Sequence, residues 1–305
     1  MEMMGLTFLK WVQEQRTPMG EDLFLRLTVA GEGFWLLAIL GTLFWAFGAR
    51  WAYRPGLALV AGDLVTSVVK NIFCIPRPWV RDPEVLPVRA AMRGAFGYSF
   101  PSGHASSSAL LWGGIAAAVR RWWVWILVLA WIAVTGLSRV YLGVHTLVDV
   151  SASWLLAFPV VWGATWAVGW AESHPAQRWK VLVGAILFAG AGGLFMYLRP
   201  VPEDAWPTFG RDTYRAVAAM LGFLAAWHVE RTWIRFDPAR LGGYRILAVV
   251  AGVLVLSLMM THLRPMLAPW LGENGAMYAA AVAGPFWIFV VWPWLLQGLA
   301  TPARP

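Results

Sequence analysis

Residues 96–114, FGYSFPSGHASSSALLWGG, join a polar cluster directly to an apolar run. The apolar half has the composition of a membrane helix, yet it is preceded by Pro101, Ser102, Gly103 and His104. Ser102 is a natural N-cap, and Gly103 permits close approach to the backbone. A helix N-terminus offers unpaired N–H groups and the positive end of the helix dipole, so it favours an anion. The stretch therefore predicts a helix that begins at an anion site, with His104 in its first turn.

The composition is that of a membrane protein. The chain has 305 residues, of which 59% are hydrophobic and only 13% are charged, and it contains 22 tryptophans. An average soluble domain is far less apolar. The net charge of +8 comes from basic residues in short gaps between apolar runs, where they fix orientation in a membrane, so we expect no nucleic-acid partner. The single cysteine, Cys74, excludes an internal disulfide and a multi-cysteine zinc site.

The apolar runs predict an all-α, polytopic membrane helix bundle. A span needs about 20 mostly apolar residues, and nine such runs are centred near Leu37, Val60, Trp112, Leu127, Leu155, Ala185, Ala219, Val253 and Ala283. Residues 1–30 mix apolar and charged side chains, which is typical of an amphipathic segment at the interface, with a helix break at Thr17-Pro18. Since no charged leader, short apolar run and cleavage site follow one another, we expect no cleaved signal peptide.

The charges predict how the bundle is oriented. Strict alternation of nine spans places most basic loops on one face, which then carries Arg50, Arg54, Arg120, Arg121, Arg178, Lys180, Arg231, Arg235, Arg240, Arg245 and Arg304. The positive-inside rule makes this face, and with it the C-terminus, cytoplasmic. The N-terminus and the gap from residue 74 to 100 then face outward. We expect a multi-pass protein of a bacterial cytoplasmic membrane, with its polar site on the non-cytoplasmic face.

Two further polar clusters fall at span ends on that outward face. Lys70 and Arg77 lie in KNIFCIPRP, where Pro78 is expected to stop the second span. SRVYLGVHTLVD carries Ser138, Arg139, His145 and Asp149 between the fourth and fifth spans. His145 and Asp149 are four residues apart at a helix start, so the carboxylate can bond one ring nitrogen and leave the other free to react. Ionisable groups at this depth are costly and are by default functional candidates.

Two neighbouring residues have plainer interpretations. Asp63 lies two turns before Lys70 on the same helical face, so it either pairs with Lys70 in a structural contact or lines the pocket. Cys74 has no activating partner in the sequence, which favours a small apolar role over that of a thiolate nucleophile.

At these residues the chain resembles the type 2 phosphatidic acid phosphatases, whose members also resemble glucose-6-phosphatases and vanadium haloperoxidases. The three motifs of that family are complete here: Lys70 to Arg77-Pro78, then Pro101-Ser102-Gly103-His104, and then Ser138-Arg139 to His145 to Asp149. The resemblance covers roughly residues 20–170. We therefore expect an interfacial segment at 1–30, a five-span phosphatase core at 31–170, and four additional spans at 171–305.

The resemblance implies a role for each motif residue. Lys70, Arg77 and Arg139 would hold the phosphoryl oxygens together with the amides of the Ser102–His104 turn. His145 would attack phosphorus and form a phosphohistidine, while Asp149 would fix its tautomer. His104 would protonate the leaving oxygen and then activate water. Pro78, Pro101 and Ser138 would support these groups. Since cations stabilise the charge, no metal and no cofactor are expected.

The expected function is hydrolysis of a phosphorylated lipid, with the bilayer as the other partner. Phosphatidic acid, phosphatidylglycerol phosphate, polyprenyl diphosphate and lipid A phosphates all fit. A water-soluble substrate such as a sugar phosphate is the alternative within the same chemistry. A lipid or anion transporter is the alternative of another class, but anion binding alone needs cations and not an imidazole backed by a carboxylate. The sequence indicates neither the head group nor the oligomeric state.

Overall fold

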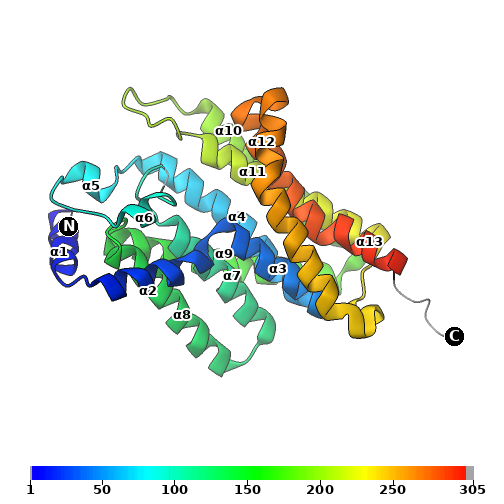
Figure 1. Ribbon diagram of the computed structural model, residues 1–305. Helices are drawn as coiled ribbons and strands as arrows, with labels where there is room; N and C mark the ends of the chain where they lie inside the picture. The colour runs from blue at the N-terminus through cyan, green and yellow to red at the C-terminus, as the bar shows by residue number, and fades with distance from the viewer. Residues whose placement is uncertain (1, 96, 300–305) are drawn as a thin grey trace.

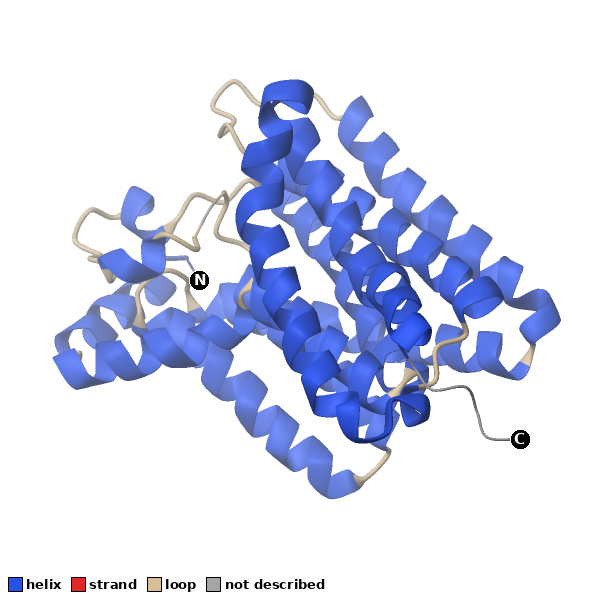
Figure 2. Ribbon diagram, turned by 45° about the vertical axis from the view of Figure 1, so that its right-hand side comes forward, coloured by secondary structure: helices blue, strands red, loops and turns tan. Residues whose placement is uncertain are grey.

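The computed structural model describes residues 2–95 and 97–299, and every regular element in them is helical (Figures 1 and 2). The first part of the chain forms α1 (Glu2–Glu14), α2 (Pro18–Thr28), η1 (Val29–Gly31), α3 (Gly33–Phe47), α4 (Ala49–Phe73), α5 (Pro78–Arg81), α6 (Arg89–Met92), α7 (Gly103–Val119), α8 (Trp122–Tyr141) and α9 (Leu147–Ser173). The remainder forms η2 (Pro175–Gln177), α10 (Arg178–Leu198), α11 (Arg211–Val229), η3 (Glu230–Ile234), η4 (Pro238–Tyr244), α12 (Arg245–Phe286), η5 (Trp287–Val291) and α13 (Trp292–Leu299).

All nine apolar runs expected from the sequence lie in helices. Among the described residues, five helical segments are long and apolar enough to cross a membrane, or six if the bent pair α2–α3 counts as one. α3 and α7 are shorter, with 15 and 17 residues. α12 has 42 residues, about 63 Å at 1.5 Å per residue, which is about twice the thickness of a bilayer core. Its backbone breaks at Gly272, where φ is +68°, so it is made of two helical parts.

The centre of the bundle is formed by α4, α7 and α9, which pack directly against one another. Glycines allow this close approach. A methyl group on Gly114 of α7 would lie only 2.5 Å from the Pro55 Cα of α4. α11 packs on the other side of α4 and against α12 in the same way, since a methyl group on Gly222 would lie 2.8 Å from the Val282 Cα. The C-terminal helices therefore continue the bundle that begins with α3 and α4.

Polar contacts join loops that the alternation of spans assigns to one face. Glu172, in the last turn of α9, binds Arg54 of α4 at 2.7 Å and Arg231, after α11, at 3.7 Å. At the opposite end of the bundle, Lys10 of α1 binds Asp82 of the loop after α5 at 2.8 Å. Each of these contacts joins segments that are expected to share a face.

The two N-terminal helices cover the end of the bundle at which α5 and α6 lie (Figure 1). α2 begins as expected at Thr17-Pro18, and the Thr17 hydroxyl accepts the Gly20 N–H. Leu9 of α1 is fully buried in a cluster with Val85, Val140 and others, whereas Phe8 and Trp11 are exposed. α1 thus packs one apolar side on the protein and leaves aromatic rings on the other.

Candidate active site

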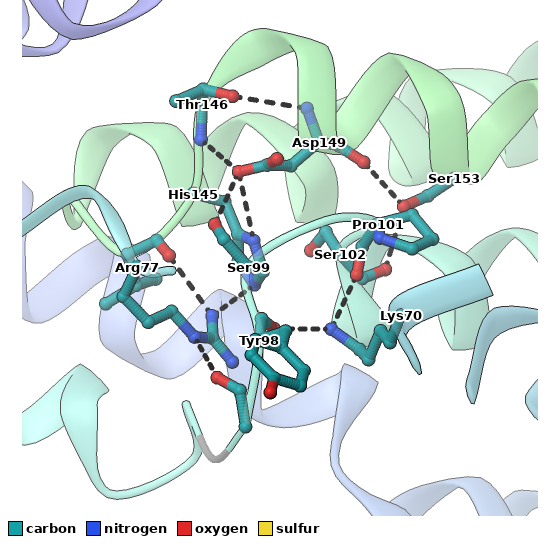
Figure 3. A network of polar contacts seen from close by, with 12 residues as sticks. Lys70, Arg77, Tyr98, Ser99, Pro101, Ser102, His145, Thr146, Asp149 and Ser153 are labelled. Carbon is teal, nitrogen blue, oxygen red and sulfur yellow. Dashed lines mark hydrogen bonds and ion pairs between the residues drawn. The ribbon is translucent and has the colours of Figure 1, made fainter. Parts of the chain in front are cut away.

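The start of α9 holds His145 and Asp149 together. Thr146 caps this helix: its hydroxyl accepts the Asp149 N–H, and the Asp149 carboxylate accepts the Thr146 N–H at 2.8 Å. Ser99 donates to the same carboxylate oxygen at 2.7 Å. That oxygen, Asp149 Oδ2, lies 3.5 Å from His145 Nδ1 (Figure 3). The capping box therefore aims a carboxylate at one nitrogen of the His145 ring.

Arg77 contacts the other nitrogen of that ring. Its Nη1 lies 2.9 Å from His145 Nε2 and also donates to the Val144 carbonyl at 3.2 Å. A guanidinium group can only donate, so Nε2 is the acceptor and carries the lone pair. The proton of the neutral ring is then on Nδ1, which faces Asp149. This is the tautomer in which Nε2 can act as a nucleophile.

His145 lies in the loop between α8 and α9 and is almost completely buried. Burial lowers the pKa of the His145 ring well below its ordinary value, and the Arg77 charge lowers this pKa further, against the opposing effect of Asp149. Because the charged ring is disfavoured, His145 is neutral at pH 7. The ring therefore has its lone pair available without first losing a proton.

Lys70 lies in the last turn of α4 and is held by two backbone carbonyls. Its Nζ donates to the Tyr98 oxygen at 2.8 Å and to the Pro101 oxygen at 2.6 Å (Figure 3). Sequence reasoning expected Pro78 to stop this helix, but α4 already ends at Phe73, and Cys74 closes it in the left-handed conformation with φ of +49°. Pro78 instead begins α5. The αL cap turns the chain so that Arg77 comes back toward the site.

α7 begins at the polar cluster that opened the sequence. Ser102 is its N-cap, as expected, but the Ser102 side chain makes no capping bond, and its N–H donates to the Asp149 carbonyl at 3.1 Å. This corrects one expectation, because the Ser102 amide is already occupied. Gly103 has open space where a Cβ would stand. The first-turn N–H groups of Gly103 and His104 have no intrahelical partner and remain suited to an anion.

His104 is fixed by close packing. A methyl group on Gly31 would lie 3.2 Å from the His104 Cδ2, and one on Gly94 would lie 3.3 Å from its Cε1. His104 Nε2 is buried and has no hydrogen-bond partner among the described residues. The ring lies within electrostatic range of Arg139, His145, Arg77 and Lys70. A buried, unpartnered nitrogen among these groups indicates a place where a ligand atom can bind.

Arg139 of α8 completes the set of cations. It is buried, and its Nη1 donates to the Thr28 hydroxyl at the end of α2 at 2.9 Å. Its Nε and Nη2 have no partner within the described part of the chain, and neither has the Ser102 hydroxyl. Buried N–H groups of an arginine are rarely left unpaired. They are well suited to a bidentate oxyanion.

Other residues singled out in the sequence lie elsewhere. The Ser138 hydroxyl donates to the Thr135 carbonyl of its own helix at 2.6 Å. Asp63 pairs with Arg215 of α11 at 3.0 Å and not with Lys70. The Cys74 thiol points to the Asn71 carbonyl at 3.2 Å. Among residues 2–95 and 97–299, no three His, Cys, Asp or Glu side chains are grouped as ligands of a metal ion.

Sequence reasoning missed Thr28, Gly31, Gly94 and Ser99, which contact the motif residues. Ser99 is three residues before Ser102 and could have been suspected from its place in the polar stretch. Thr28 and Gly31 are far in the chain from the side chains that they contact, and Gly94 is ten residues before His104; no local pattern marks any of the three.

Comparison with known proteins points to one family of phosphatases. Residues 51–173 match the model of the PAP2 superfamily. The match covers 123 of the 305 residues, so it is this segment of the chain that is similar to the PAP2 superfamily. The PAP2 segment contains Lys70, Arg77, His104, Arg139, His145 and Asp149, whereas Thr28 and Gly31 precede it and α10 to α13 follow it.

A curated relative supports the same family. The chain is 24% identical over 151 residues to a dihydrosphingosine 1-phosphate phosphatase of Schizosaccharomyces pombe, which covers 46% of this chain and 36% of the relative. The matched part is thus about a third of that protein's length. No significant match to a solved structure was found.

Proposed function

We propose that this chain is an integral membrane phosphatase that hydrolyses a phosphate monoester or diphosphate of a lipid through a phosphohistidine intermediate. The observation that carries the proposal is the His145 ring, with a lone pair on Nε2 beside Arg77 and a proton on Nδ1 facing Asp149. A site that only binds anions has no need of such a ring. The PAP2 segment and the name of the S. pombe relative support a lipid phosphate as the substrate.

In the proposed first step, Lys70, Arg77 and Arg139 bind the phosphoryl oxygens. Oxyanions are stronger acceptors than an imidazole, so bound phosphate draws the Arg77 N–H groups away from His145 Nε2. The lone pair then forms a bond to phosphorus while the bond to the lipid oxygen breaks. His104 gives its proton to that oxygen, and Asp149 stabilises the positive charge on His145.

In the proposed second step, water replaces His145 on phosphorus. His104, now neutral, takes a proton from the water as its oxygen bonds to phosphorus and the bond to Nε2 breaks. Inorganic phosphate leaves, and both histidines return to their starting state. The cations supply the charge stabilisation, so the proposed reaction is independent of metal and cofactor.

The proposed topology places the site at the non-cytoplasmic end of nine crossings. α3, α4, α7, α8, α9, α10, α11 and the two parts of α12, the second continued by η5 and α13, supply these crossings. Residues 1–30 lie at the interface, residues 31–170 form the phosphatase core, and residues 171–305 add four helices with the C-terminus in the cytoplasm. The basis for this orientation is the excess of Lys and Arg in the loops assigned to the cytoplasmic face.

The experiment is phosphate release by the detergent-solubilised full chain. The panel comprises phosphatidic acid, phosphatidylglycerol phosphate, polyprenyl diphosphate, dihydrosphingosine 1-phosphate and glucose 6-phosphate, each with and without a chelator. We expect release from one or more lipids, no loss with the chelator, and no release by His145→Ala. His174→Ala is the matched control, because His174 is exposed after α9. Release from glucose 6-phosphate alone would contradict the lipid assignment, and no release from any compound would contradict an enzyme.

A further inference from the structure

Two adjacent carbonyls hold two of the three site cations. The Gly97 oxygen accepts from Arg77 Nε at 2.8 Å, and the Tyr98 oxygen accepts from Lys70 Nζ at 2.8 Å (Figure 3). Lys70 lies in the last turn of α4, and Arg77 is the N-cap of α5, so neither helix alone fixes the distance between them. The backbone at residues 97–98 therefore contacts both cations and helps to set the distance between them, together with the Pro101 carbonyl that also accepts from Lys70.

The segment between α10 and α11 packs against this backbone. The Trp206 ring stacks on the Tyr98 ring with centroids 5.5 Å apart and planes 29° apart. The backbone N–H of Trp206 donates to the Tyr98 hydroxyl at 3.2 Å. Gly97 has φ of +66°, and a methyl group on it would lie 3.0 Å from the Thr208 Oγ1. Both carbonyl-bearing residues are thus in contact with a segment outside the PAP2 match.

The same segment is also tied to the end of α4. Asn71, the residue after Lys70, accepts the Gly210 N–H at 3.0 Å and donates to the Thr213 hydroxyl at 3.1 Å. Arg199 donates to the Ile72 carbonyl at 3.0 Å. Residues 199–213 therefore contact both the helix that carries Lys70 and the backbone that accepts its hydrogen bond.

We propose that Trp206 is a positioning residue of the phosphate site: by stacking on Tyr98 it sets the Tyr98 carbonyl that orients Lys70. On this proposal, which rests on the proposed function, the C-terminal helices complete the site of the PAP2 core. Trp206 touches neither substrate nor reacting atoms and acts only through Tyr98. Since Lys70 binds the phosphoryl oxygens before and during the reaction, its displacement weakens phosphate binding and raises KM more than it lowers kcat.

The test is the affinity of the full chain in detergent for inorganic phosphate, measured by titration calorimetry beside a thermal melt. We expect Trp206→Ala to bind phosphate about tenfold more weakly, in line with the worth of one charge-assisted hydrogen bond. Trp206→Phe keeps a stacking ring and the backbone N–H, so we expect it to restore binding to within about twofold. Trp270→Ala is the matched control, because Trp270 also belongs to the C-terminal helices, in α12, and is 86% exposed. We expect wild-type affinity for this variant.

Wild-type affinity in a folded Trp206→Ala protein would overturn the proposal. Should that variant fail to fold, Trp206→Leu decides, because it keeps an apolar side chain there but removes the ring that stacks on Tyr98; we expect about threefold weaker binding, and unchanged binding would overturn the proposal. If the wild-type chain itself neither binds phosphate nor releases it from any lipid, the proposed function has failed and not this inference alone.

Discussion

The two histidines of the site are held in opposite ways. His145 is oriented by polar groups on both ring nitrogens, with Arg77 at Nε2 and Asp149 facing Nδ1. His104 is oriented by packing against Gly31 and Gly94, and its Nε2 has no partner among the described residues. A nucleophile needs one fixed tautomer, which the Arg77 hydrogen bond to Nε2 and the carboxylate 3.5 Å from Nδ1 supply. A residue that first gives and then takes a proton needs a nitrogen that no protein group occupies, which close packing supplies.

The largest expected effect concerns the carboxylate on the His145 side. Asp149→Asn would place an amide beside Nδ1 and favour the tautomer with its proton on Nε2, where no lone pair remains. We expect kcat to fall by about 10³- to 10⁴-fold. Ser99→Ala is the control, since it removes one hydrogen bond to the carboxylate without changing its charge, and we expect a loss of less than about tenfold. Equal losses of kcat in the two variants would contradict the claim that Asp149 sets the tautomer of His145.

The next effect concerns proton transfer on the His104 side. His104→Ala should slow release from a lipid phosphate by about 10²- to 10⁴-fold, because the lipid alkoxide needs a proton to leave. Nitrophenyl phosphate has a better leaving group, so His104→Ala should slow the first step with this substrate much less than with a lipid phosphate. Single-turnover measurements with both substrates give the comparison. Equal losses of rate with the two substrates would count against His104 as the proton donor, and therefore against the different roles assigned to the two histidines.

A smaller effect tests whether packing orients His104. Gly94→Ala places a methyl group 3.3 Å from the ring, so the ring must shift by a few tenths of an ångström. We expect kcat to fall by about three- to tenfold, since reacting groups tolerate little displacement. Gly184→Ala in α10 is the control, because nothing lies near its Cβ position. Unchanged kcat in Gly94→Ala would show that the ring is not held by this contact.

The smallest effect is a shift in titration of His145. Burial and Arg77 lower the pKa of its ring, so the ring becomes protonated only when the pH falls below the ordinary histidine value of about 6.5. The lone pair on Nε2 and the stability that depends on the neutral ring are therefore kept at pH 6.5 and lost at lower pH. ¹⁵N NMR of the protein with labelled histidine measures the protonation of the His145 ring as the pH is lowered. A midpoint at or above pH 6.5 would contradict the assigned surroundings of His145.

The sequence predicted what short-range patterns can encode. All nine apolar runs are helical, the break at Thr17-Pro18 is confirmed, and the spacing of His145 and Asp149 does place them on one helix start. Apolar runs identify helices because a spanning helix satisfies its own backbone hydrogen bonds. The end of α4 was predicted wrongly, because Cys74 closes that helix in a left-handed conformation before any proline is reached.

Contacts between distant segments could not be predicted in this way. Arg139 meets Thr28 across 111 residues, and Asp63 meets Arg215 across 152. Apolar periodicity says which face of a helix is buried but not which neighbour covers it. Gly31 and Trp206 likewise contact residues far away in the chain, His104 and Tyr98, and neither lies in a motif.

The measurement that tests the central claim most directly is trapping of the phosphorylated protein. The wild-type chain is mixed with a lipid labelled with ³²P in its phosphate, quenched in alkali within one turnover, digested and mapped. The account predicts an alkali-stable, acid-labile label on the peptide that carries His145, and no label in His145→Ala. Turnover by the wild-type chain without label on that peptide, or label on a peptide carrying Cys74 instead, would contradict it.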